Sequence, residues 1–421
     1  MIVIAARTED RACLVFRFLK LSEANSITNS ARDASVETLG LYVHVPFCAV
    51  KCFYCDFTAF AGQKSQFDRY IDAVDAEAGL RGDGLSPETL YFGGGTPSEL
   101  PVEALNYLLT RLDKRFGPLH KMREVTFEAN PESLSVEKMD VLSRAGVSRL
   151  SLGLQTAEDA LLKAIGRRHS FEEFLTVYRE AQRRGFAMSV DLMFGLPGQT
   201  RAQARASVQR VLELDPGHIS VYGLQVMEKT VFGKREVEVN EDLARLMMED
   251  TLDALAGNGY KHYEVSNFAR PGREGIHNLN YWVNGSYLGL GCGAAGYLAG
   301  ERYQNEEKLK VYCERVEAGR VPTASSERLT GKEALGETMM LKLRLMDGMP
   351  LTTDLQDAFR GEIEGLVDRG LLTLETEGCS RSVAKLSLTA EGVFLANEVY
   401  REFVPPFSAA PKRHVHENLC A

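Results

Sequence analysis

The chain has 421 residues, of which 44% are hydrophobic and 25% are charged, as in ordinary globular proteins with one large domain and one or two small ones. The net charge of −9 argues against a general affinity for nucleic acid or for an anionic membrane. No apolar run approaches the roughly 20 residues that span a bilayer, so we expect no membrane segment.

Residues 1–37 are expected to form an N-terminal extension that is disordered. They carry Arg7, Arg11 and Arg17 among acidic residues, whereas a transit peptide is poor in acids. The apolar block Cys13–Phe16 is too short for a signal peptide. We therefore expect a cytoplasmic protein.

Residues 38–235 alternate short apolar runs with amphipathic stretches of helical period. The apolar runs are Leu41–Phe47, Thr89–Phe92, Glu124–Glu128, Arg149–Leu154, Met188–Phe194 and Ile219–Leu224. The amphipathic stretches are Ser65–Leu80, Val102–Phe116, Val136–Ala145, Phe171–Arg184 and Ala202–Leu214. A strand that alternates with a helix in this way is typical of a parallel sheet. The pattern predicts an α/β fold, specifically a partial TIM-like (β/α)6 barrel.

The pattern changes after residue 235. Residues 236–325 are expected to be a connecting region, with a helix at Glu241–Asn258 and a loop-rich aromatic stretch over 260–303. Residues 326–403 are expected to form a winged-helix-like domain, and 404–421 a loose tail. The expected elements of that domain are helices at Gly331–Arg344, Leu351–Ala358 and Ile363–Arg369 and strands at Leu371–Thr376 and Ser382–Leu388. Residues 327–402 carry 9 Lys and Arg against 14 Asp and Glu, so we do not expect this domain to bind DNA.

Three of the eight cysteines, Cys48, Cys52 and Cys55, fall within eight residues directly after the first predicted strand. A disulfide framework would spread its cysteines more evenly over a shorter chain. A structural zinc site needs a fourth Cys or His, and position 57, where a fourth Cys could stand, is Phe57. Buried, unliganded cysteines are the third alternative. Three thiolates on a 4Fe–4S cluster leave one iron open for a small ligand, and the spacing favours such a cluster.

Polar residues and glycines recur where the predicted strands end, which is where barrels of this kind place their active sites. The glycine run 93–95 follows the second strand and lets backbone N–H groups approach a ligand, although a tight turn explains it equally well. Each residue alone could be an ordinary loop or capping residue. Their shared position favours a common pocket. The candidates are Tyr42, Tyr54, Gly94, Gly95, Thr96, Glu128, Gln155, Arg167 and Asp191.

The Cys-x3-Cys-x2-Cys spacing resembles the signature of the radical S-adenosylmethionine (radical SAM) superfamily. The resemblance implies that the open iron binds the amino and carboxylate groups of SAM, and that SAM cleavage yields a 5′-deoxyadenosyl radical. It assigns the nine candidates above to the SAM pocket.

Longer segments narrow the resemblance to the oxygen-independent coproporphyrinogen III oxidase family. These are YVHVPFC at 42–48, GGGTP at 93–97, FEANP at 127–131, LGLQT at 152–156 and DLMFGLPGQT at 191–200. Within that family, Cys-Asp-Phe at 55–57 and the motif His277-Asn278-x-x-Tyr281-Trp282 resemble the HemW-type heme chaperone branch.

The HemW-type resemblance implies heme as a ligand and heme-accepting proteins, respiratory hemoproteins among them, as partners, with a homodimer left open. It assigns heme binding to His277, Asn278, Tyr281 and Trp282. An imidazole can ligate heme iron, and Tyr and Trp offer flat apolar faces to the macrocycle. A His in a loop is otherwise more often a hydrogen-bonded structural residue.

One segment departs from the family pattern. Residues 289–296 read GLGCGAAG, with Ala295 where the family has a His, so the second axial heme ligand is left open, and Cys292 lies nearby.

Two other functions compete with the chaperone. One is the anaerobic oxidase, which decarboxylates two propionates of coproporphyrinogen III. The other is a radical SAM enzyme that modifies tRNA, which would need a basic RNA-binding appendage or extra cluster ligands, and neither is visible in this sequence.

Overall fold

The computed structural model describes residues 38–375 and 384–407. The extension 1–37 and most of the expected tail, 408–421, lie outside these described residues. Contacts divide the described chain into two compact units. The first contains residues 38–281 and Gly285–Arg328, and the second contains Trp282–Asn284 and the described residues from Leu329 onward.

The first unit is built on a 12-stranded sheet whose central strands are parallel. The parallel strands, in sheet order, are β1 (Gly40–Val45), β4 (Thr89–Gly94), β5 (Glu124–Ala129), β6 (Arg149–Gln155), β7 (Ala187–Phe194) and β8 (His218–Gly223). All six coincide with the predicted apolar runs to within two residues at each end. The predicted α/β class with six strand–helix units is confirmed.

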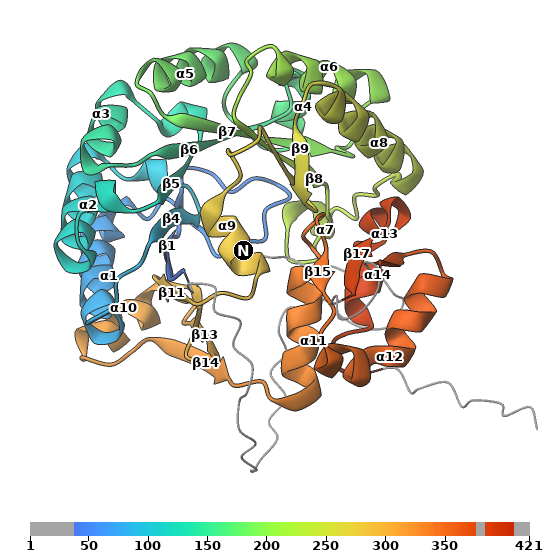
Figure 1. Ribbon diagram of the computed structural model, residues 1–421. Helices are drawn as coiled ribbons and strands as arrows, with labels where there is room; N and C mark the ends of the chain where they lie inside the picture. Colours follow the sequence, from blue (N-terminus) through green and yellow to red (C-terminus); the bar gives the residue numbers. More distant parts are fainter. Residues whose placement is uncertain (1–37, 376–383, 408–421) are drawn as a thin grey trace, which may run out of the picture. The chain divides into compact units, whose positions relative to one another are not determined.

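Helices follow these strands and lie around the outside of the sheet (Figure 1). They are α1 (Phe67–Arg81), α2 (Val102–Phe116), α3 (Val136–Ala145), α4 (Asp159–Ala164), α5 (Phe171–Arg183) and α6 (Arg201–Leu212). Local sequence sets several of their ends. Ser170 with Glu173, and Thr200 with Gln203, form capping boxes that satisfy the first free N–H groups of α5 and α6.

Side chains alternate strictly between the two faces of the parallel strands. On β5, Val125 and Phe127 are at most 1% exposed on one face, and Glu124, Thr126 and Glu128 occupy the other. The other strands repeat this pattern, since alternate residues of a strand point to opposite faces. The same polar face carries Thr89 and Tyr91, Arg149 and Ser151, Ser189 and Asp191, and His218 and Ser220. A barrel interior is usually filled by branched apolar residues, so a polar one indicates room for a polar ligand or for water.

The stretch 260–303, expected to be loop-rich, is largely regular, and that prediction is wrong. It contains β9 (Lys261–Glu264), β10 (Asn267–Ala269), α9 (Ile276–Trp282), β11 (Tyr287–Leu290), β12 (Ala295–Leu298) and β13 (Glu301–Asn305). Two further elements follow, α10 (Leu309–Glu317) and β14 (Thr323–Glu327). These strands are only three to five residues long and extend the sheet at both edges. Runs this short carry little periodicity, so pairing with the larger sheet determines their conformation.

The second unit contains α11 (Gly331–Lys342), α12 (Thr353–Asp368), a three-stranded sheet, α13 (Ala390–Phe394) and α14 (Ala396–Arg401). Its strands are β15 (Met349–Pro350), β16 (Leu372–Glu375) and β17 (Lys385–Leu388). The two helices expected at 351–358 and 363–369 correspond to the two parts of α12, which are separated by a kink at Phe359, where the backbone is not helical (φ −130°, ψ 25°). Phe359 is fully buried and its ring packs 5.3 Å from that of Phe403, so the kink is packed in the core of this unit. The second predicted strand begins in 376–383, outside the described residues.

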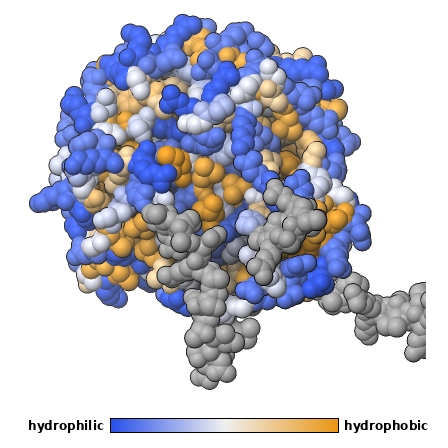
Figure 2. Space-filling model, viewed as in Figure 1, coloured by the Kyte–Doolittle hydropathy of each residue, from blue (hydrophilic) through white to orange (hydrophobic). Residues whose placement is uncertain are grey.

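Within the described ranges, no helix is both long enough and apolar enough to cross a membrane. Figure 2 shows a face on which hydrophilic residues surround scattered hydrophobic ones, as on ordinary protein surfaces.

Candidate cofactor site at the carboxyl ends of the strands

The three predicted cluster cysteines share one loop that follows β1. Cys48 ends β2 (Phe47–Cys48), which pairs in parallel with β3 (Phe60–Ala61), so the chain returns beside its own starting point. Cys52 and Cys55 lie on the loop between these strands, and the Cys55 N–H donates to the Cys52 carbonyl at 3.2 Å. We refer to residues 48–59 as the Cys loop.

All three thiols are free and partly buried. Burial raises the pKa of the Cys55 thiol to about 12, so its thiolate needs a cation beside it. No three His, Cys, Asp or Glu side chains in the described ranges converge as ligands of a single metal ion do. A four-iron cluster makes a different demand, because each thiolate binds its own iron and the sulfurs stay apart. Three free thiols on one loop are a donor set that fits such a cluster.

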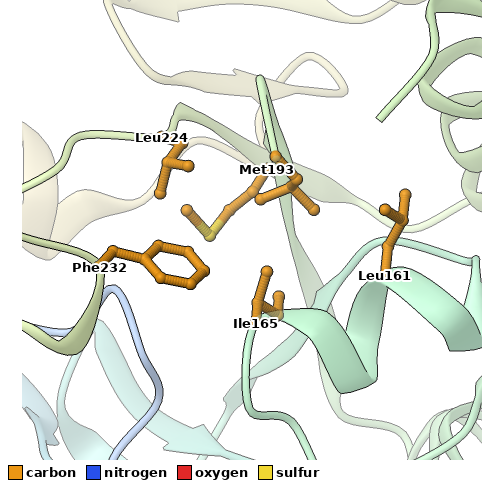
Figure 3. Packing of buried hydrophobic residues seen from close by; sticks show 6 residues of the cluster. Leu161, Ile165, Met193, Leu224 and Phe232 are labelled. Atoms are coloured by element: carbon orange, nitrogen blue, oxygen red, sulfur yellow. The ribbon is translucent and has the colours of Figure 1, made fainter. Parts of the chain in front are cut away.

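The Cys loop is anchored by Phe53, which stands between two of the cysteines. Its N–H donates to Ile165 and its carbonyl accepts from the N–H of Phe232 at 2.9 Å. Phe53 and Tyr54 both pack against a buried apolar cluster, part of which is shown in Figure 3. That cluster contains Leu161, Ile165, Met193, Leu196, Leu224 and Phe232. The loop is thereby held at the carboxyl ends of β6, β7 and β8.

The glycines after β4 bring the backbone closer to His44 and Phe47 than residues with a side chain could come. A Cβ on Gly94 would lie 2.5 Å from the His44 ring, and Gly94 has a φ of 110° that side-chain-bearing residues rarely adopt. A Cβ on Gly95 would lie 2.7 Å from the Phe47 carbonyl oxygen. Thr96 follows, and its hydroxyl lies 3.4 Å from the Cys48 sulfur. The run therefore brings backbone directly beside the Cys loop.

Gln155 and Arg167 meet at the end of β6. Gln155 has a φ of 72°, at a register shift between β6 and β7, which turns its side chain out of the normal strand direction. Arg167 is buried and donates to Asn130 at 2.8 Å and to the Gly153 carbonyl at 2.6 Å. Its Nη1 lies 3.9 Å from the Cys52 sulfur, and its Nε has no hydrogen-bond partner among the described residues. A buried donor without a partner beside the Cys loop fits a site that takes an anionic ligand group.

Two carboxylates complete this edge of the sheet. Burial raises the pKa of Glu128 to about 7, with repulsion from Asp191 adding to the effect and a hydrogen bond from Tyr91 opposing it. Burial likewise raises the pKa of Asp191 to about 6, opposed by hydrogen bonds from Ser220 and Ser151. Tyr42 lies on β1 within the same polar face, and its ring stacks 6.3 Å from that of Tyr91.

Below these carboxylates the polar face encloses a chamber of about 40 Å³. It is lined by Tyr91, Glu124, Thr126, Glu128, Arg149, Ser151, Ser189, Asp191, His218, Ser220, Tyr222, Gly275 and Asn278. Asn278 thus faces the barrel interior. The Thr126 hydroxyl is buried and has no protein partner within the described residues, so water is its natural partner.

The opposite end of the barrel is closed by α9, which lies inside the ring of strands and helices (Figure 1). Glu124, the first residue of β5, accepts the N–H groups of Ile276 and His277 at 3.2 and 3.1 Å. Glu124 also forms a buried ion pair with Arg149, the first residue of β6, at 3.1 Å. His277 is fully buried and bonds to Thr89, the first residue of β4. The helix that carries the motif 277–282 therefore lies at the amino ends of the strands, away from the Cys loop.

The structure does not group the four expected heme-binding residues in one exposed patch. The His277 ring bonds to the Thr89 hydroxyl at 2.8 Å and to the Tyr281 hydroxyl at 2.7 Å. Trp282 is 6% exposed, belongs with the second unit, and lies beneath the Arg344 guanidinium at 4.2 Å.

The structure places Ala295, the departure from the family pattern, and the neighbouring Cys292 in different surroundings. Ala295 is exposed on β12, and Cys292 is fully buried, which raises the pKa of its thiol.

Comparisons with known proteins agree with this geometry. The family described as the radical SAM superfamily matches residues 42–211. The heme chaperone HemW of Bacillus subtilis (strain 168) is 37% identical over 374 residues, which cover 86% of this chain and 98% of the relative. The chain belongs to the HemW family. HemW of Escherichia coli (strain K12) is 33% identical over 351 residues, covering 80% of this chain and 92% of that relative.

The chain also shares its fold with a solved radical SAM enzyme, the coproporphyrinogen III oxidase HemN of Escherichia coli. The TM-score is 0.77 over 88% of this chain and 90% of HemN, at 23% identity. At this identity the likeness concerns the fold alone. Membership of the radical SAM superfamily implies a 4Fe–4S cluster and SAM as cofactors, in agreement with the free thiols of the Cys loop and the close backbone approach at Gly94 and Gly95.

Sequence reasoning missed several residues that hold this site together. Phe53 anchors the Cys loop, Tyr91 bonds to Glu128, and Glu124 with Arg149 holds α9. The alternation of polar and apolar residues along each strand is the signal that could have found the last three, since it marks the residues that face the barrel interior.

Proposed function

We propose that this protein is a heme chaperone, which binds heme and delivers it to acceptor hemoproteins while carrying a 4Fe–4S cluster and SAM. The observation that carries the proposal is the similarity to relatives named heme chaperone HemW over 80–86% of the chain. The Cys-Asp-Phe segment at 55–57, which resembles the HemW-type branch of the family, supports the same choice.

In this proposal Cys48, Cys52 and Cys55 hold the cluster through their thiolates. The cluster would supply an open iron and one electron at a time. Gly94, Gly95 and Thr96 offer backbone and hydroxyl groups to the polar end of SAM, with Gln155 and the buried Arg167 beside them. Tyr42, Glu128 and Asp191 face the interior of the barrel and would hold the rest of the cofactor, while Tyr54 lies in the Cys loop itself and packs against the apolar cluster. A cluster with an open iron needs a reducing compartment, so we place the protein in the cytoplasm.

Heme would be bound separately, by the motif on α9. His277 is proposed as the iron ligand, Tyr281 and Trp282 as flat faces for the macrocycle, and Asn278 as a polar neighbour on the same helix. Because α9 lies at the amino ends of the strands and the Cys loop at their carboxyl ends, heme and SAM would occupy different ends of the barrel.

The test is heme titration and an oxidase assay on one anaerobically reconstituted sample. The proposal expects a Soret band that saturates with one heme per chain and no SAM-dependent conversion of coproporphyrinogen III. Conversion to protoporphyrinogen IX would favour the oxidase, the function of the solved HemN structure that shares this fold. The absence of any saturable heme binding would contradict the chaperone.

A further inference from the structure

Arg167, Asn130 and Thr96 form a chain of hydrogen bonds that ends at a cysteine sulfur. Nη2 of Arg167 donates to the side-chain oxygen of Asn130 at 2.8 Å. The amide nitrogen of Asn130 donates to the Thr96 hydroxyl at 3.1 Å, and this hydroxyl lies 3.4 Å from the sulfur of Cys48. The chain therefore joins the loop after β5 to the glycine run and to the Cys loop.

The guanidinium of Arg167 fixes the direction of each hydrogen bond in this chain. A guanidinium has donors and no acceptor, so the oxygen of Asn130 must face it and the NH2 group must face Thr96. The Thr96 hydroxyl then accepts from Asn130 and has its single proton left to donate. A cysteine that binds iron is a thiolate and can only accept, so this proton points to the sulfur of Cys48.

The backbone of each member of the chain is held in place. Arg167 is buried, and its Nη2 also bonds to a carbonyl of β6 at 2.6 Å. The N–H of Asn130 donates to the Ser98 hydroxyl at 3.2 Å. The N–H of Thr96 donates to the Phe47 carbonyl at 2.7 Å, directly before the first cysteine of the Cys loop. Since the backbone is fixed, the direction of the Thr96 O–H depends on the amide of Asn130.

The same guanidinium approaches a second cysteine. Nη1 of Arg167 lies 3.9 Å from the sulfur of Cys52. Reduction of a cluster adds one negative charge, and hydrogen bonds to the cysteine sulfurs are among the factors that set its reduction potential. A donor that points at a sulfur stabilises the added negative charge and so favours the reduced form. Arg167 therefore acts on Cys52 directly and on Cys48 through the chain of hydrogen bonds.

We propose that Asn130 is a positioning residue, which turns the Thr96 hydroxyl toward the sulfur of Cys48 and thereby raises the reduction potential of the cluster. This inference rests on the part of the proposed function that places a 4Fe–4S cluster on the Cys loop, and it does not depend on heme. The step that it concerns is the uptake of one electron from a one-electron reductant, in which no bond forms or breaks. Thr96 keeps a second lone pair for the amino group of SAM.

The experiment is a redox titration of the anaerobically reconstituted full chain with dithionite, followed by the EPR signal of the reduced cluster. Asn130→Asp keeps the acceptor for Arg167 but removes the donor to Thr96, whose hydroxyl then turns to the new carboxylate. The equilibrium constant for reduction should fall about 10-fold, as for one hydrogen bond to a charged group, which lowers a one-electron midpoint potential by about 59 mV. Thr96→Val should lower the potential by a similar amount, and Thr96→Ser should keep the wild-type value.

Two comparisons separate the chain of hydrogen bonds from other effects of the substitutions. Asn130→Asp also adds a charge, so it is measured again in the Thr96→Val background, where only the charge acts and the fall in potential should be smaller. Ser133→Ala removes a hydroxyl that bonds to the backbone carbonyl of Asn130 and not to its amide. This matched control should keep the wild-type potential. Iron and sulfide contents show which variants carry the cluster.

An unchanged or higher midpoint potential in Thr96→Val or in Asn130→Asp would overturn the inference, and either variant decides the matter if the other fails to take up the cluster. An equal fall from Asn130→Asp in both backgrounds would show that Asn130 does not act through Thr96, which would overturn it as well. A wild-type chain that takes up no iron and gives no EPR signal would instead contradict the proposed cluster.

Discussion

The hydroxyl of Tyr91 donates a hydrogen bond of 2.7 Å to the carboxylate of Glu128. The same Tyr91 ring stacks on Tyr42 and lies 5.4 Å from the ring of His277. One side chain therefore contacts the proposed SAM pocket on one side and the helix that carries the proposed heme ligand on the other.

Replacing Tyr91 by Phe should weaken SAM binding while leaving the cluster in place. The hydrogen bond from Tyr91 opposes the effect of burial on Glu128, so its loss raises the pKa of Glu128 further and makes the carboxylate a poorer ligand for a cation. We expect a loss of about 2- to 10-fold in SAM affinity, measured from the change in the EPR signal of the reduced cluster. Tyr107→Phe, which removes a surface phenol bonded to Asp72, is the control. Equal SAM affinity in both variants would exclude Glu128 from the pocket.

Replacing Cys48, Cys52 and Cys55 together by Ala should abolish the cluster. Thiolates are the protein ligands of such a cluster, so iron and sulfide should fall from about four of each per chain to background. Far-ultraviolet circular dichroism should stay unchanged, because the three thiols are only partly buried. Cys313→Ala, at a buried cysteine on α10, should keep full iron content. Iron retained in the triple variant would place the cluster elsewhere.

Replacing Phe53 by Ala should destabilise the cluster without removing a ligand. Its ring packs 6.0 Å from that of Phe232 and holds the Cys loop on the apolar cluster of Figure 3. We expect iron to be lost to a chelator faster than in the wild type, followed by absorption near 400 nm. Val50→Ala, at an exposed residue of the same loop, is the matched control and should behave as the wild type. If the two variants lose iron at the same rate, Phe53 does not anchor the loop.

Replacing Glu128 by Gln should stabilise the cofactor-free protein at pH 8 and have less effect at pH 5. The pKa of Glu128 is about 7 in the folded protein against an ordinary 4.5, so the folded state holds its proton more tightly. That contribution to stability is complete below pH 4.5 and is lost as the pH rises through 7. Gln removes the cost of a buried charge above pH 7. Urea unfolding at both pH values measures the difference, with the exposed Glu228→Gln as control. If the stabilisation of Glu128→Gln relative to the wild type is smaller at pH 8 than at pH 5, the raised pKa of Glu128 is contradicted.

Replacing Glu124 by Ala should destabilise the fold strongly. The substitution leaves Arg149 charged, buried and without its partner, and it removes the acceptor for two N–H groups of α9. Breaking a buried pair in this way costs about 3–5 kcal/mol, measured by urea unfolding. Glu88→Ala, which breaks the more exposed pair with Arg123, should cost about 1 kcal/mol or less. The double variant Glu124→Ala/Arg149→Met should recover part of the loss, and no recovery would show that the unpaired charge is not the cause.

The six parallel strands could be predicted from the sequence because each is a short run rich in apolar residues, and because amphipathic helical stretches alternate with these runs. The positions of Glu128, Gln155 and Asp191 near the strand ends followed from the same reasoning, since parallel strands place their carboxyl ends at one edge. The pairing of β9–β14 could not be predicted in this way. Strands of three to five residues have too little periodicity, and their partners are distant in sequence.

The sequence by itself determined the class of the fold, the three cysteines and the family, because these depend on local periodicity, on spacing within one loop and on contiguous motifs. Only the tertiary structure decided where the motif 277–282 lies and what its residues contact. His277 is separated by 188 residues from Thr89 and by 153 residues from Glu124, whose carboxylate accepts its N–H. Contacts between residues so far apart depend on how the sheet closes around α9. The motif can therefore be interpreted from the sequence as a heme-binding motif, while the burial of His277 against Thr89 and Tyr281 becomes visible only in the folded chain.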